Sequence, residues 1–231
     1  MTAGLAVEIK VNVGAAQIEQ AMQVFGLAPD KGKKRRIWFG EVVDGRDGPG
    51  ALPLLDRGVI LRVRGKKSGG DSTLKLRGPD GCLDVEAWRT RAARFEGDAK
   101  IEGDWAGRRL VSASLDHDLD ALTDPPPQLT DLLSKEQQEL AGELLIPLDR
   151  VTLLGPIEAR KWEPDGDIAA ELWTVDELRF LEISVLATDD PDEAQRRLRQ
   201  RAADGGLELD SEQETKTSIV LRHLARRGGP R

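Results

Sequence analysis

The chain has 231 residues, of which 39% are hydrophobic and 32% charged, and its formal net charge is −7. This acidic balance argues against a general binder of nucleic acid or of anionic membranes. The single cysteine, Cys82, excludes an intrachain disulfide and a cysteine-based zinc site. With only His117 and His223, a bound metal would depend on carboxylates, which suit Mg²⁺ or Mn²⁺. Neither a signal peptide nor a long apolar run is found, so we expect a soluble cytoplasmic protein.

The first half of the chain predicts strands with one helix between them. Residues 5–13 form the first expected strand, and residues 15–27 form a helix that Gly26 ends. A strand over 35–44 leads into a glycine-rich loop at 45–50. Two pairs of short strands follow, at 58–65 with 72–78 and at 99–105 with 108–116, and Gly107 lies in the second turn.

The second half repeats this character after a proline-rich break at 124–128. A helix is expected over 129–145, then strands at 150–162, 167–175 and 178–187. A helix over 189–207 has an acidic start and Pro191 near its first turn, and a last helix begins near Glu214. Because similar strands lie on both sides of the prolines, we predict one α+β domain over 1–231 that closes into a single sheet.

Five of these strands separate an apolar face from a charged one. In 5–13, Glu8 and Lys10 alternate with valine and isoleucine, and the same alternation recurs in 58–65, 72–78, 99–105 and 178–187. On any one strand, a solvated outer face explains such a pattern. Here the polar positions are nearly all fully charged, and acids and bases share the same strands. A barrel with a charged lumen explains both features, because bases bind phosphate oxygens while acids hold a bridging divalent cation.

The ordered set of motifs resembles the CYTH superfamily of triphosphate tunnel metalloenzymes. The family's Glu-x-Glu-x-Lys strand corresponds to residues 6–10, so that Ala6 replaces the first Glu, and its late Glu-x-Glu strand corresponds to 182–184, where Ser184 replaces the second. The other matching positions are Arg62, Arg64, Lys75, Lys100, Glu102, Asp104, Arg160, Glu171 and Lys216.

The resemblance implies an eight-stranded antiparallel tunnel barrel with flanking helices. Members hydrolyse inorganic triphosphate, thiamine triphosphate or nucleoside triphosphates, a few cyclise ATP, and all need Mg²⁺ or Mn²⁺. It also implies roles by position. Glu171 is the expected catalytic residue, as a metal ligand or by orienting the attacking water. Phosphate would be bound by Lys10, Arg62, Arg64, Lys75, Lys100 and Arg160, and metal by Glu8, Glu102, Asp104 and Glu182.

Three functions stay open at this point. The first is a metal-dependent triphosphatase, the second an adenylate cyclase of the same fold, and the third a non-catalytic protein that binds triphosphate or polyphosphate. The carboxylates lost at Ala6 and Ser184 favour the third, because gripping phosphate needs only cations. A basic run at 31–36 is either a solvated edge or an attractor of polyanions to the tunnel mouth. A small triphosphate or polyphosphate is the expected partner, without nucleic acid or membrane, and a homodimer is left open.

Overall fold

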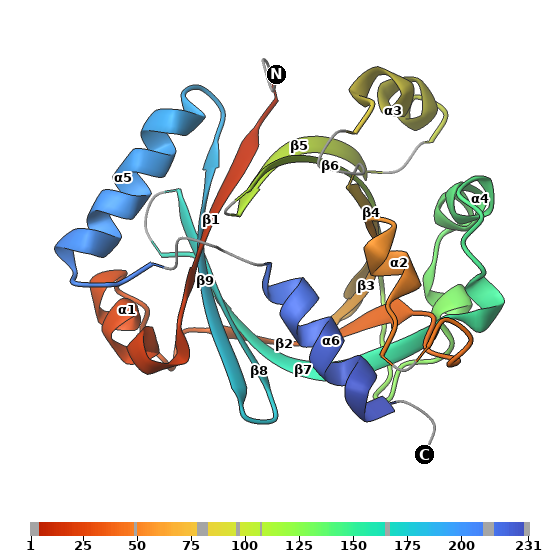
Figure 1. The fold of residues 1–231 in the computed structure, drawn as a ribbon, viewed down its shortest axis with the longest axis horizontal. Coiled ribbons are helices and arrows are strands. Elements are labelled where there is room, and N and C mark those ends of the chain that lie inside the picture. The colour runs from red at the N-terminus through yellow and green to blue at the C-terminus, as the bar shows by residue number, and fades with distance from the viewer. Residues whose placement is uncertain are drawn as a thin grey trace.

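The computed structural model describes residues 5–48, 50–77, 83–95, 98–106, 108–164, 167–209 and 215–228. Nine strands form one closed barrel (Figure 1), in the order β1-β5-β6-β4-β3-β2-β7-β8-β9. The strands are β1 (Val7–Val13), β2 (Lys33–Glu41), β3 (Val59–Gly65), β4 (Gly70–Arg77), β5 (Asp98–Ala106), β6 (Arg108–Leu119), β7 (Thr152–Trp162), β8 (Ile168–Val175) and β9 (Leu178–Ala187).

The barrel is mixed, so the expectation of eight antiparallel strands is wrong in count and in one pairing. β1 runs parallel to β5, with Val7 opposite Gly103, while the other eight pairings are antiparallel. Geometry requires this exception, because a closed ring with an odd number of strands cannot alternate direction at every neighbour. The alternation in the sequence had indicated nine strand segments, and only the family resemblance reduced them to eight.

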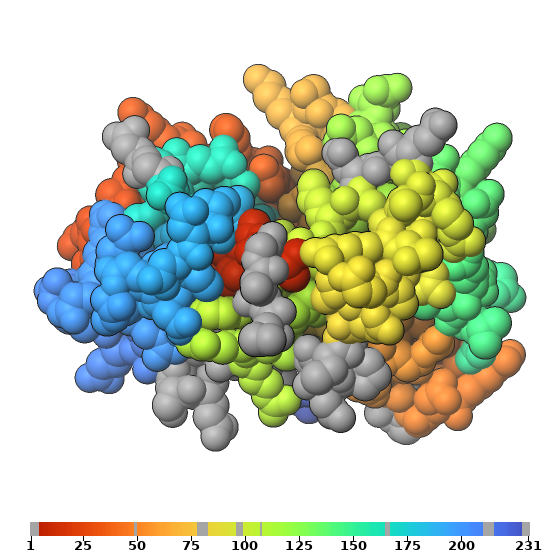
Figure 2. Space-filling model, turned by 90° about the horizontal axis from the view of Figure 1, so that it is seen from above, coloured from red at the N-terminus to blue at the C-terminus, as the bar shows by residue number. Residues whose placement is uncertain are grey.

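The described part of the chain contains six α-helices, which surround or enter the barrel (Figure 1). They are α1 (Ile18–Val24), α2 (Pro53–Asp56), α3 (Val85–Ala92), α4 (Lys135–Glu143), α5 (Pro191–Asp204) and α6 (Lys216–Gly228). Figure 2 shows α5 and α3 on either side of the start of β1. No described helix has the length and apolar character needed to cross a membrane.

One expected helix is divided, two helices were not expected, and some residues named from the sequence lie outside the described residues. The helix expected over 129–145 is divided into a 3-10 turn, Leu129–Leu132, and α4, because Ser134 and Gln137 form a capping box that starts a new helix. Helices α2 and α3 were not expected. Cys82, Gly107 and Glu214 lie outside the described residues, and the last described helix begins at Lys216.

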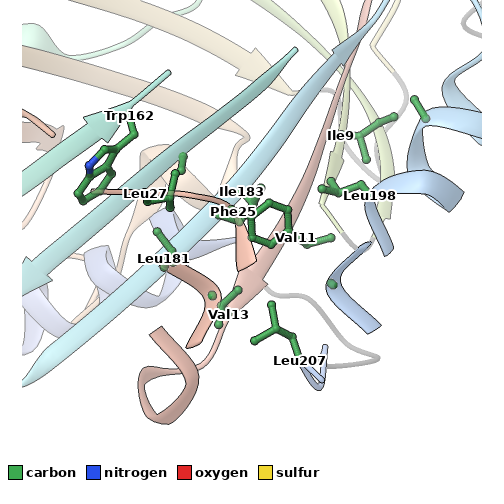
Figure 3. Close-up of a cluster of buried hydrophobic side chains, with 14 of the residues drawn as sticks. Ile9, Val11, Val13, Phe25, Leu27, Trp162, Leu181, Ile183, Leu198 and Leu207 are labelled. Carbon is green, nitrogen blue, oxygen red and sulfur yellow. The ribbon is translucent and has the colours of Figure 1, made fainter. Parts of the chain in front are cut away.

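The apolar strand faces point outward, beneath the helices. Figure 3 shows Ile9, Val11 and Val13 of β1 packed with Phe25 beside α1 and Leu198 of α5. All five side chains are almost fully buried, and each contributes about 1.5–3 kcal/mol of hydrophobic stabilisation. The charged faces of the same strands therefore point into the lumen, as the repeated alternation predicted.

Helix α6 fills one end of the barrel (Figure 1). Its Val220, Leu221 and Ala225 belong to a buried cluster that includes Phe39 and Ile60, which face inward. The charged cavity is thus bounded on this side by an apolar layer, and the first residues of α6 contribute to its wall.

The contact between the parallel strands depends on Gly103. A Cβ at this position would lie 2.8 Å from a methyl group of Val7, so a side chain would push β1 and β5 apart. We expect Gly103→Ala to lower the free energy of unfolding by about 1–3 kcal/mol, measured by urea denaturation.

Gly142→Ala is the matched control, because Gly142 lies in α4 and nothing stands within 4 Å of its added Cβ. Alanine there should raise stability by up to about 1 kcal/mol. A Gly103→Ala protein as stable as the wild type would show that the closure tolerates a wider spacing.

Candidate active site

The barrel encloses a charged cavity of about 260 Å³. Nine basic and six acidic side chains line it, an excess of three positive charges in a chain whose formal net charge is −7. The local sign of charge is therefore opposite to that of the whole molecule. The basic residues are Lys10, Arg35, Arg62, Arg64, Lys75, Arg77, Lys100, Lys161 and Lys216, and the acidic residues are Glu8, Glu102, Asp104, Asp116, Glu171 and Glu182.

Ten of the eleven predicted site residues line this cavity, and Arg160 does not. The Arg160 guanidinium donates instead to the carbonyl oxygen of Pro29, at 2.8 Å. Side chains alternate along β7, and Ala159 and Lys161 are the ones that point into the barrel. Lys161 therefore occupies the lumen position that was expected for Arg160. The predicted phosphate contact of Arg160 therefore does not fit the structure.

Asp104 is the centre of the first group of charges. Its carboxylate, 1% exposed, lies 3.0 Å from Lys10 Nζ, 3.0 Å from Lys75 Nζ and 2.7 Å from Arg77 Nη2. Burial alone would raise the pKa of Asp104, but the three cations outweigh it and hold the pKa well below its usual value. Lys10 also contacts Glu8 at 2.8 Å, and although burial opposes its charged form, these carboxylates raise its pKa.

Lys216 is the centre of the second group. This buried ammonium lies 2.8 Å from Glu171 and 3.0 Å from Glu182, and 4.2 Å from the centre of the Trp173 ring. Glu171 and Glu182 are register partners on β8 and β9, so the ammonium separates two facing carboxylates. Burial would raise the pKa of Glu171, but Lys216 lowers it to about 2. The start of α6 is thereby tied to the tunnel wall.

Arg62 and Arg64 lie side by side on β3 and face the lumen. Arg62 donates to Thr73 Oγ1 at 3.0 Å, and Arg64 Nε lies 2.6 Å from Asp71. Burial and the neighbouring Arg64 lower the pKa of Arg62 to about 10, so it stays charged at neutral pH. Among the described residues, the Nε atoms of Arg62 and Arg77 are buried and find no acceptor. Such donors fit an anionic ligand, because buried polar groups are normally hydrogen-bonded.

The carboxylates of β1 and β5 are oxygen ligands of the kind that a hard divalent cation prefers. Glu8 is the register partner of Asp104, and Glu102 precedes Asp104 by two positions on the same face. Glu8 and Glu102 are the more accessible, at 32% and 26%. Mg²⁺ and Mn²⁺ prefer oxygen ligands, and water with phosphate oxygens commonly completes their shell.

Across the described residues, no three tunnel carboxylates bring their oxygens within 4.8 Å of one another. The group whose ligand atoms do lie that close is Asp176 and Glu177 of the β8–β9 turn with His223 of α6. A tunnel cation would therefore need ligands from the substrate. Ser184 faces the cavity opposite Lys10, where the family pattern has a carboxylate, and Ala6 is not part of the lining.

Several lining residues were missed in the sequence. The sequence left the face of Arg77 uncertain, and the structure places it on the same face as Lys75, as the two-residue alternation of the strand requires. Arg35 gave no such signal, because the next inward positions on β2 are the apolar Ile37 and Phe39. Asp116 accepts from Thr73 at 2.7 Å and contacts Lys100 at 3.0 Å, although its surroundings resembled a loop.

Two chains among the solved structures that resemble this one carry the comparison. A candidate adenylate cyclase from Bacillus halodurans has a TM-score of 0.63 and 14% identity, over 93% of this chain and 96% of that one. A candidate adenylyl cyclase from Hippeastrum, described as having a dominant triphosphatase activity, has a TM-score of 0.58 and 14% identity, over 98% of both chains. Comparisons with protein-family models and with curated protein sequences find no match.

We expect Lys216→Met to destabilise the protein at pH 7 by about 3–5 kcal/mol, because Glu171 and Glu182 lose the cation between them. The pKa of Glu171 is depressed from 4.5 to about 2, so its stabilising effect is complete above about pH 4.5 and disappears as the pH falls toward 2. The difference between wild type and variant should shrink over that interval. Urea denaturation at pH 7 and at low pH measures it.

Lys135→Met is the control, since Lys135 is an exposed lysine that also begins a helix. It should change stability by no more than about 0.5 kcal/mol at either pH. An equal loss from Lys216→Met at both pH values would contradict the electrostatic account.

Proposed function

Because the chain has the tunnel-barrel fold of CYTH-like adenylate cyclases and triphosphatases, we propose that it binds a triphosphate in the lumen and hydrolyses it with Mg²⁺ or Mn²⁺. The observation that carries this proposal is the excess of basic side chains in the cavity inside the barrel of an acidic protein. A compact polyanion matches that excess, and the interleaved carboxylates provide oxygen ligands for a cation.

The cations would act on the phosphate chain in two ways. Arg62 and Arg64 offer planar guanidinium donors for bidentate contacts, and Lys75 and Lys10 add point charges nearby. Held in this way, the terminal phosphorus would meet a water molecule in line. A P–O bond to the water forms as the bridging P–O bond breaks, the shortened chain leaves with the bridging oxygen, and the protons of the water remain on the orthophosphate that forms. Fixed positive charges in a water-poor site stabilise the charge that develops on the oxygens.

Glu171 would position the water and would be a poor general base. Its pKa of about 2 lies far from the neutral range in which a base is effective. Its orientation is fixed, since Oε2 accepts from Lys216 at 2.8 Å and from Trp173 Nε1 at 2.9 Å. A carboxylate held in this way can accept a hydrogen bond from water without taking its proton.

Glu8, Glu102 and Asp104 would hold the divalent cation together with phosphate oxygens. When bound, the cation supplies charge neutralisation on the phosphate. Glu182 was expected as a fourth ligand, but its carboxylate already contacts Lys216 at 3.0 Å. Glu8 and Glu102 are also paired with lysines, but at 32% and 26% they are more exposed than Glu182 at 13%, and they are therefore the better-placed ligands.

The two alternatives have specific support. A cyclase function agrees with the descriptions of both similar structures. A non-catalytic binding function agrees with the three cations on Asp104, which leave that carboxylate with little capacity for a metal.

The deciding experiment incubates the purified protein with inorganic triphosphate and with organic triphosphates, with and without Mg²⁺ or Mn²⁺. Phosphate release that depends on the metal is the expected result. Cyclic nucleotide formation without phosphate release would favour the cyclase. Tight triphosphate binding without turnover under any metal would favour the binding protein.

Arg62→Ala should weaken tripolyphosphate binding by about 1.5–3 kcal/mol, because a buried charged donor is lost from the cavity. Calorimetric titration measures the effect. Arg160→Ala serves as the control, because Arg160 lies on the next strand but one from β3 and outside the lining. The Arg160→Ala protein should bind tripolyphosphate as tightly as the wild type. A loss of affinity in Arg160→Ala but not in Arg62→Ala would show that the phosphate binds outside the tunnel.

A further inference from the structure

A second cavity, of about 810 Å³, lies on the outside of the barrel along the first half of β2; we call it the β2 groove. Its walls are β2, the β3–β4 turn and residues 122–124, with Glu158 of β7 at one side. The basic run at 31–36 of the sequence leads into it. The lining residues are Lys33, Lys34, Arg35, Arg36, Trp38, Gly65, Lys66, Lys67, Ser68, Leu122, Thr123, Asp124 and Glu158.

The β2 groove is strongly basic. Six of its lining residues are cationic and two are acidic, and both acids contact Arg36. Lys34 and Lys67 are exposed, and within the described residues neither has a carboxylate partner. An anionic ligand would supply the missing counter-charge.

Two contacts join the β2 groove to the tunnel. Arg35 lines both cavities, and its guanidinium lies 3.9 Å from Glu171 inside the tunnel. Asp71 bridges a tunnel residue and a groove residue, since it lies 2.6 Å from Arg64 and 2.9 Å from Lys66. A row of cations therefore runs from Arg62 and Arg64 in the lumen to Lys66 and Lys67 in the β2 groove, with Asp71 between Arg64 and Lys66.

We propose that the β2 groove binds the outer phosphates of a linear polyphosphate whose terminal phosphates lie in the tunnel. This inference rests on the proposed function, because the tunnel must first accept a phosphate chain. A repeating polyanion matches a continuous row of cations. An aromatic base is a poorer match, because Trp38 is 4% exposed and offers no free ring face for stacking.

The test compares tripolyphosphate with long-chain polyphosphate by calorimetry. The wild type should bind the long chain more tightly, and this excess affinity should fall as salt is raised, since each exposed contact is screened. The double variant Lys34→Ala with Lys67→Ala should lose about tenfold in affinity for the long chain and keep its affinity for tripolyphosphate. The control removes two exposed arginines of α5, Arg197→Ala with Arg199→Ala, and should change neither affinity.

Four results separate this inference from the proposed function. Equal wild-type affinity for both probes would overturn the groove and leave the tunnel site intact. Loss of long-chain affinity in both double variants would also overturn it, as an effect of net charge alone. Long-chain binding that needs Lys34 and Lys67, without any tripolyphosphate binding, would contradict the tunnel site and, with it, this inference, and would make the groove a separate polyphosphate site. A single-stranded oligonucleotide that binds as tightly as polyphosphate through the same lysines would make the groove a nucleic-acid site and overturn the inference.

Discussion

The contact of Asp104 with Lys10, Lys75 and Arg77 is the interaction on which the tunnel depends. Three cations within 3.0 Å of one carboxylate would repel one another without it, in a space where little water screens them. Two of these cations respond differently to their surroundings. Carboxylates outweigh burial and raise the pKa of Lys10, whereas burial and the neighbouring Lys10 lower the pKa of Lys75. The wall thus carries a surplus of positive charge that one acid only partly balances.

That surplus connects the fold to the proposed function. In the barrel, apolar side chains are buried outside, under helices, and charged side chains are gathered inside, which is stable only when the inner charges pair. A phosphate chain that enters would provide new acceptors for Lys10, Lys75 and Arg77. Their release from Asp104 and Glu8 would free carboxylate oxygens for a divalent cation that arrives with the substrate. Binding of the anion and of the metal would then support each other.

Strand alternation accounts for most of what the sequence predicted correctly. A period of two places Lys10, Glu102 and Glu182 on one side of their strands, and the closed sheet turns that side inward. Whether the Arg160 side chain points into or out of the barrel depends on the register of the long strand β7. The register of β2 with β7 shifts between Ile37 and Phe39, so the sequence alone did not tell which of two adjacent basic residues faces the lumen.

Other features depend on tertiary packing and had no local signal. Arg35 faces the lumen from a strand whose following inward residues are apolar, because α6 fills that end of the barrel. Helix α3 begins at Asp84, whose side-chain Oδ1 caps the helix by accepting a hydrogen bond from the backbone N–H of Ala87 at 2.9 Å. The segment shows little apolar periodicity, so the sequence did not indicate a helix there. The parallel pairing of β1 with β5 follows from ring closure, which involves all nine strands at once.

The two halves of the tunnel balance their acids differently. Between Glu171 and Glu182 the counter-charge is the ammonium of Lys216, which the backbone of α6 and the Trp173 ring hold in place. Near Glu8 and Glu102 the lysines approach from the strands themselves, and the carboxylates remain partly accessible. Two carboxylates and the Trp173 ring hold the ammonium of Lys216, whereas Lys75 lies 3.4 Å from Glu102 and can turn toward phosphate. The half at Glu8 and Glu102 is therefore the half that would exchange its cations for a metal.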